Sequence, residues 1–94
     1  MDVDEDFYNR ADAHINLSNE QLKTVDGRGK VSASMMYAAA RFNAWVSACG
    51  HASGADMAAM REETVRYFCD EYKKALEVHL DDYIENFDRY MRPN

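Results

Sequence analysis

Apolar residues recur at three- and four-residue steps along most of the chain, which is the period of an α-helix rather than of a strand. Glycine-containing turns at residues 26–30 and 50–54 interrupt the pattern, and the one proline, Pro93, stands near the end. The pattern therefore predicts three helical segments and gives little support to strands.

The first segment runs from about residue 4 to residue 25, with Asp4 or Asp6 available to cap its start. One face of this helix is apolar or small: Phe7, Tyr8, Ala11, Ile15, Ser18, Leu22 and Val25. A polar edge follows beside it: Asn9, Asp12, Asn16 and Asn19. Asparagine and aspartate are poor helix formers, so we expect some interaction of their side chains to offset the cost to helix stability.

The second segment, residues 31–49, is expected to start with Ser32 as its cap and to end at Gly50 in a left-handed conformation. Its main apolar face is Val31, Met35, Ala38, Ala39, Phe42, Trp45, Val46 and Cys49. The opposite face is small or apolar, and it is the predicted oligomer face: Ala33, Met36, Ala40, Ala44 and Ser47. A helix that is apolar on all sides is normally buried on all sides. Either the returning end of the third segment or another subunit must cover the second face, and the pattern slightly favours another subunit.

The third segment opens with Ser53 and Asp56, which approximate a capping box. Its apolar stripe continues to Tyr90 and would span roughly 55 Å as one helix, against about 30 Å for each of the other two. A bend or break between His79 and Asp82 is slightly favoured, with Asp82 and Glu85 as a second capping pair. The predicted fold is thus all-α, an antiparallel bundle of three long helices, the third either continuous or broken into a short fourth.

With 94 residues, of which 47% are apolar, the chain has the length and composition of one helical domain over residues 1–94. Residues 1–3 and 93–94 are expected to be frayed. The net charge of −6 opposes nucleic-acid binding. The acidic start differs from a secretory signal, and no stretch reaches the length of a membrane span, so a cytoplasmic location is expected. Residues 27–54 carry three bases and no acid. Arg41 is therefore expected to pair with Asp12 or Asp82.

Several stretches together resemble a family of short bacterial proteins classed as a domain of unknown function. They are FYNRADAHINL at 7–17, NEQ at 19–21, GKVSAS at 29–34, YAAARFNA at 37–44 and LDDYIENF at 80–87. The resemblance covers most of the chain and implies a bacterial, soluble, helical protein. It implies no activity and no catalytic residue.

No catalytic, cofactor or metal constellation is recognised, so the sequence leans against an enzyme without deciding the matter. No glutamate stands three residues before His14, His51 or His79, as a ferritin-like site would require. We expect His79 to be a hydrogen-bonded core histidine. Cys49 and Cys69 are expected to be buried structural thiols.

Two weaker sites are left open. The polar edge, with Arg41 and Asn43 across from it, is either a groove for a ligand or partner or an interhelical hydrogen-bond network, and the network is favoured. Arg28, Lys30 and Ser32 at a helix start either bind an anion or form a solvated turn, and the turn is favoured.

The sequence therefore predicts a protein-interaction or self-assembly module. Its expected partner is itself, as a homodimer, or another protein, with no cofactor, nucleic acid or membrane. The alternative is a helical bundle that binds a small anionic metabolite.

Overall fold

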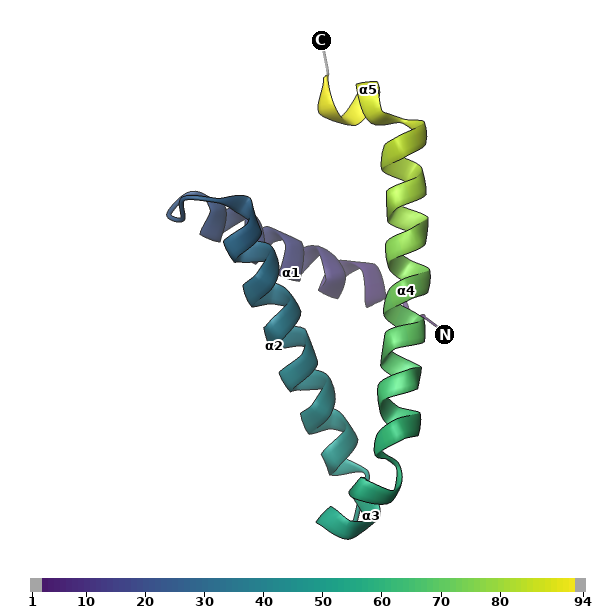
Figure 1. Cartoon of the computed structure of the whole chain (residues 1–94). Coiled ribbons are helices and arrows are strands. Elements are labelled where there is room, and N and C mark those ends of the chain that lie inside the picture. Colours follow the sequence, from purple (N-terminus) through teal and green to yellow (C-terminus); the bar gives the residue numbers. More distant parts are fainter. Residues whose placement is uncertain (1–2, 93–94) are drawn as a thin grey trace. The chain divides into compact units, whose positions relative to one another are not determined.

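The computed structural model describes residues 3–92, which contain five helices and no strand (Figure 1). The helices are α1 (Phe7–Leu22), α2 (Arg28–Cys49), α3 (Gly54–Ala59), α4 (Arg61–Glu85) and α5 (Phe87–Met91). The all-α class is confirmed. Of the residues predicted to fray, Val3 precedes the first helix without regular structure, and the other four lie outside the described residues.

The chain divides into two compact units, Met1–Val46 and Ser47–Asn94, with the boundary inside α2. Each unit is described by itself. The antiparallel arrangement of three long helices and the single domain over residues 1–94 stay predictions.

In the first unit, α1 and α2 lie together near the turn at residues 23–27 and diverge away from it (Figure 1). Val31 is buried there, with 6% of its surface exposed, and Met35 beside it is half-buried. The Ser18 hydroxyl on α1 lies 3.7 Å from the Met35 sulfur. Farther along α2, Phe42 and Trp45 are exposed. Packing between the two helices is thus concentrated at the turn.

The start of α2 differs from the prediction. The helix begins at Arg28, directly after Gly27, whose φ of +116° favours glycine. Ser32 consequently lies inside the helix and is not its cap. The other end, at Cys49, is as predicted, but Gly50 does not adopt the left-handed conformation. Its amide instead donates to the Ser47 carbonyl at 3.0 Å, and a tightened last turn satisfies the helix end.

The start of the third predicted segment is confirmed, because the Ser53 hydroxyl accepts a hydrogen bond from the Asp56 amide at 3.1 Å. The helix is then interrupted at Met60, which the sequence pattern did not indicate. Met60 ends α3 and begins α4 with φ −101° and ψ 4°. Its carbonyl accepts from both the amide and the hydroxyl of Thr64, each at 2.9 Å, so the new helix starts with its first carbonyl satisfied.

The predicted break between His79 and Asp82 is wrong in position, because α4 continues through these residues to Glu85. Asp82 caps no new helix. Its carboxylate accepts from the Asn86 side-chain amide at 2.9 Å and from the Tyr90 hydroxyl at 3.0 Å. The Tyr90 ring also lies against Tyr83, with centroids 4.9 Å apart. These contacts fasten α5 to the last turn of α4, so the break falls at Asn86.

Removal of the Ser53 cap should cost stability. We expect Ser53→Ala to lower the free energy of unfolding by about 1 kcal/mol, because the Asp56 amide loses its acceptor. Urea denaturation followed by circular dichroism measures the change. Ser34→Ala, the same substitution within α2, is the matched control and should have little effect. Equal losses in both variants would contradict the capping role.

Candidate functional site

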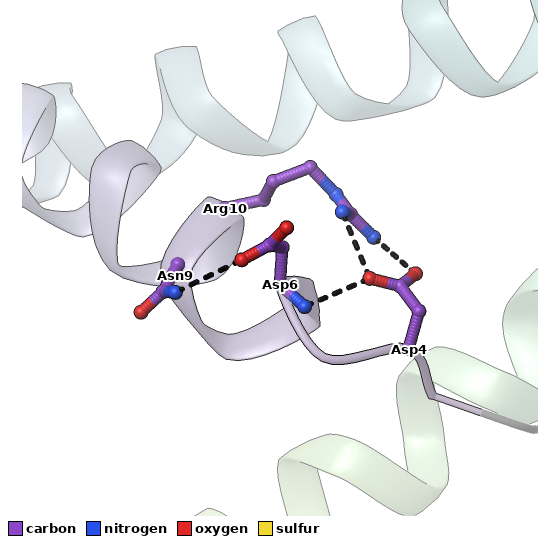
Figure 2. A network of polar contacts seen from close by, with 4 residues as sticks. All are labelled: Asp4, Asp6, Asn9 and Arg10. Atoms are coloured by element: carbon purple, nitrogen blue, oxygen red, sulfur yellow. Dashed lines mark hydrogen bonds and ion pairs between the residues drawn. The ribbon is translucent and has the colours of Figure 1, made fainter.

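The polar edge lies on α1, where Asn9, Asp12, Asn16 and Asn19 are all exposed. Asn9 makes a local contact, since its side-chain amide donates to Asp6 Oδ1 at 3.3 Å (Figure 2). Asp6 occupies the N-cap position, but its side chain caps no amide of the helix. At the N-terminal end of the polar edge, the side chain of Asn9 is therefore held by a residue close to it in sequence.

Asp4 and Arg10 form the strongest polar contact of this region (Figure 2). Arg10 Nη2 lies 2.8 Å from Asp4 Oδ2, and Nη1 lies 3.1 Å from Oδ1. The Asp6 amide also donates to Asp4 Oδ1 at 3.0 Å. The Arg10 hydrogen bond, followed by that amide, lowers the pKa of Asp4, and the same ion pair raises the pKa of Arg10. Both side chains are exposed, so the pair adds little to stability.

The second half of the predicted groove lies on α2, where Arg41 is exposed and Asn43 is half-buried. Within the first unit, no hydrogen bond or ion pair of the described residues joins either residue to the polar edge of α1, and the pairing of Arg41 with Asp82, which lies in the second unit, stays a prediction. The ion pairs of the described residues are local in sequence: Arg10 with Asp4, Lys23 with Glu20, Arg61 with Glu62, Lys73 with Glu77 and Lys74 with Glu71. The interhelical network that the sequence favoured is thus not seen, and the groove stays a prediction.

The predicted anion site lies in the first turns of α2, where Arg28, Lys30 and Ser32 are exposed. A shallow, open hollow next to the turn is lined by Leu22, Val25, Gly27 and Arg28. Of the three predicted residues, this hollow includes Arg28. The anion site therefore also stays a prediction.

The thiols and His79 lie elsewhere than expected. Cys49, Cys69 and His79 are all exposed, so the prediction that they belong to a core is wrong. They lie on the helix faces that the pattern assigned to the interior, and within their own unit no other element buries them. In the same part of the chain, no group of three or more histidine, cysteine, aspartate or glutamate residues is placed to hold a metal ion.

Uncovered apolar surface is the dominant feature of this molecule. Along residues 3–92, Val31 is the one buried hydrophobic residue, whereas Tyr37, Phe42 and Trp45 expose 78%, 61% and 60% of their surface. On the predicted oligomer face, Ala33, Met36, Ala40 and Ala44 are exposed and Ser47 is half-buried. The sequence pattern identified the apolar helix faces correctly. It did not indicate that their own unit would leave most of these side chains exposed.

Long apolar helices raise the question of a membrane. None of the helices between residues 3 and 92 combines the length and the apolar character needed to cross a bilayer.

Comparison of the sequence with protein-family models finds a match. The family model described as "Protein of unknown function (DUF3144)" matches residues 7–84. The chain belongs to this family. The predicted resemblance to a family of unknown function is therefore confirmed. The DUF3144 match covers α1, α2, α3 and nearly all of α4, and it ends close to the α4–α5 break.

A solved structure is similar over the whole length. "NMR structure of the protein NB7890A from Shewanella sp" is 38% identical, with a TM-score of 0.80, and the alignment covers 100% of this chain and 99% of that one. A comparison with curated proteins finds no match. The DUF3144 family thus brings a fold and no assigned activity.

The Asp4–Arg10 pair predicts a pH effect. A carboxyl group whose pKa is lowered by folding stabilises the folded state at neutral pH, and this contribution is lost as pH falls through the lowered pKa. We expect Arg10→Gln to return the pKa of Asp4 toward its ordinary range, as measured by NMR titration of the side-chain carboxyl. Lys23→Gln, which removes the ion pair with Glu20 at the other end of α1, should leave the titration of Asp4 unchanged. An unaltered Asp4 titration in Arg10→Gln would show that the amide of Asp6 alone causes the shift.

The exposed polar edge predicts a small stability effect. Asn16→Ala should change the free energy of unfolding by less than about 0.5 kcal/mol, because alanine is the better helix former and no hydrogen bond of Asn16 is seen. Asn86→Ala is the control, since it removes the contacts with Asp82 and should cost about 1 kcal/mol. A decrease of 1 kcal/mol or more in the free energy of unfolding of Asn16→Ala would instead support the interhelical hydrogen-bond network.

Proposed function

We propose that this chain is a protein-interaction module that assembles with itself through the uncovered apolar surface of its helices. The observation that carries the proposal is the exposure of large apolar side chains along α2, with Val31 alone buried among the hydrophobic residues at 3–92. Covering one such side chain stabilises a complex by about 1.5–3 kcal/mol before the costs of association. Contiguous exposed apolar patches mark interaction surfaces.

The geometry of α2 supports a contact on more than one side. In an α-helix, residues two positions apart point roughly 160° away from each other. Ala40 and Ala44 consequently lie opposite Phe42, which belongs to the same face as Val31. Since α1 packs on the Val31 face, the side with Ala40 and Ala44 is open to a second partner.

Charge and composition fit a soluble assembly in a bacterial cytoplasm, which is part of the same proposal. The net charge of −6 keeps such an assembly soluble and disfavours nucleic acid as its partner. A small anionic ligand has less support, because the described structure does not bring Arg28, Lys30 and Arg41 to one site.

A larger side chain on the side of α2 that carries Ala40 and Ala44 tests the proposal. The wild-type chain should sediment above monomer mass at high micromolar concentration. Ala40→Leu should lower that mass while circular dichroism keeps its helical signal, because a closely packed helix contact between subunits is forced apart.

Ala13→Leu is the matched control, since Ala13 is exposed on the side of α1 away from its apolar face. Its mass in solution should equal that of the wild type. A wild-type chain that stays monomeric throughout would overturn self-assembly, and loss of helicity in Ala40→Leu would place the contact within one chain.

A further inference from the structure

A single residue, Asn86, separates α4 from α5, and α5 turns aside from the axis of α4 (Figure 1). The backbone of Asn86, with φ −115° and ψ 29°, lies outside the helical region. Residues 80–92 contain no glycine and no proline, so the covalent chain itself does not prevent a helix from continuing through the joint. The cause of the bend therefore lies in side-chain contacts.

Asp82, one turn before the joint, is the acceptor in these contacts. Its backbone carbonyl accepts from both the amide and the side chain of Asn86, at 3.0 Å and 3.1 Å. Its carboxylate accepts from the Asn86 side chain at 2.9 Å and from the Tyr90 hydroxyl at 3.0 Å. Asparagine is a favoured N-cap residue, yet the Asn86 side chain does not cap α5. The five residues of α5 are too few for a stable helix alone, so its position depends on these contacts.

Two of the contacts belong to the bent form alone. The Tyr83 and Tyr90 ring centroids lie 4.9 Å apart. In a helix that continued from α4 into α5, residues seven positions apart would be separated by about 10 Å along the axis. In such a helix the Asp82 side chain would also lean away from Tyr90, because helical side chains point toward the N-terminus. A continuous helix would therefore lose both the ring contact and the hydrogen bond between Asp82 and Tyr90.

A continuous helix would also lengthen the apolar stripe of α4, which includes the exposed residues Leu76 and Tyr83. Phe87 and Tyr90 follow Tyr83 at steps of four and seven residues, so they would lie on the same face. The stripe would become about 10 Å longer. In the bent form, the Tyr90 ring instead lies against Tyr83.

We propose that the joint between α4 and α5 is a two-state switch that sets the length of this stripe. In the bent state, Asp82 and Tyr90 hold α5 aside, and the Tyr90 ring lies on Tyr83. In the straight state, α4 continues to Met91 and carries Phe87 and Tyr90 in line with Tyr83. A surface that covers the longer stripe shifts the chain to the straight state, because it gains contacts that only this state offers. The switch is a property of one chain and does not depend on the proposed self-assembly.

Removal of the Asp82 side chain tests the switch. In the wild-type chain, NMR should show nuclear Overhauser effects between the rings of Tyr83 and Tyr90. We expect Asp82→Ala to lose these effects and to move the backbone chemical shifts of Asn86 to helical values, because alanine supplies no acceptor and favours a helix. Asp81→Ala is the matched control: Asp81 is exposed, and no side-chain hydrogen bond of Asp81 is seen among residues 3–92. This control should keep the ring contact.

Two other results of Asp82→Ala would overturn the proposal. A ring contact that persists would show that the bend does not depend on Asp82. A ring contact that disappears while residues 86–91 take the chemical shifts of coil would show that α5 unfolds instead of continuing α4. Helical chemical shifts over residues 61–79 show in the same spectra that the rest of α4 is intact.

Tyr90→Phe separates the hydrogen bond from the ring. It removes the hydroxyl that donates to Asp82 and keeps an aromatic ring to lie on Tyr83. We expect a weakened ring contact and chemical shifts of Asn86 between those of the wild type and Asp82→Ala, because part of the population straightens. Tyr67→Phe, the same substitution at an exposed residue of α4 away from the joint, should leave Asn86 unchanged. Wild-type shifts of Asn86 in Tyr90→Phe would contradict control of the bend by the hydroxyl.

Discussion

Burial of apolar surface is the constraint on which this structure depends. α2 is apolar on opposite sides, and its own unit covers one of these sides only near the turn, at Val31 and Met35. The remaining side chains, among them Phe42 and Trp45, stay in contact with water until another surface meets them. Apolar burial is the dominant favourable term in both folding and association, which is why the interaction surface is proposed on these same helix faces.

Local hydrogen bonds, in contrast, determine where the helices begin and end. Ser53 starts α3, Thr64 satisfies the first carbonyl of α4, and Asn86 and Tyr90 converge on Asp82 to fasten α5. All of these contacts join residues at most eight positions apart. They are formed within one unit and do not depend on a distant partner.

The polar residues of the chain follow the same local rule. Asp4, just before α1, pairs with Arg10 in the first turn of the helix, and the other ion pairs of the described residues join close neighbours in sequence. No convergent polar site results from such contacts. The DUF3144 family membership agrees with this, because it brings a shared fold without an assigned chemistry.

The sequence by itself determined the helical class, the turns at Gly27 and Gly50, the Ser53 cap and the family, because periodicity, glycine and capping chemistry act over a few residues. Only the tertiary structure decided the rest. The structure located the interruption at Met60 and the break at Asn86, because the local hydrogen bonds at these two places leave no trace in the apolar periodicity. The exposure of Cys49, Cys69 and His79 depends on which apolar faces find a cover, and a stripe of apolar residues indicates a buried face without naming what buries it.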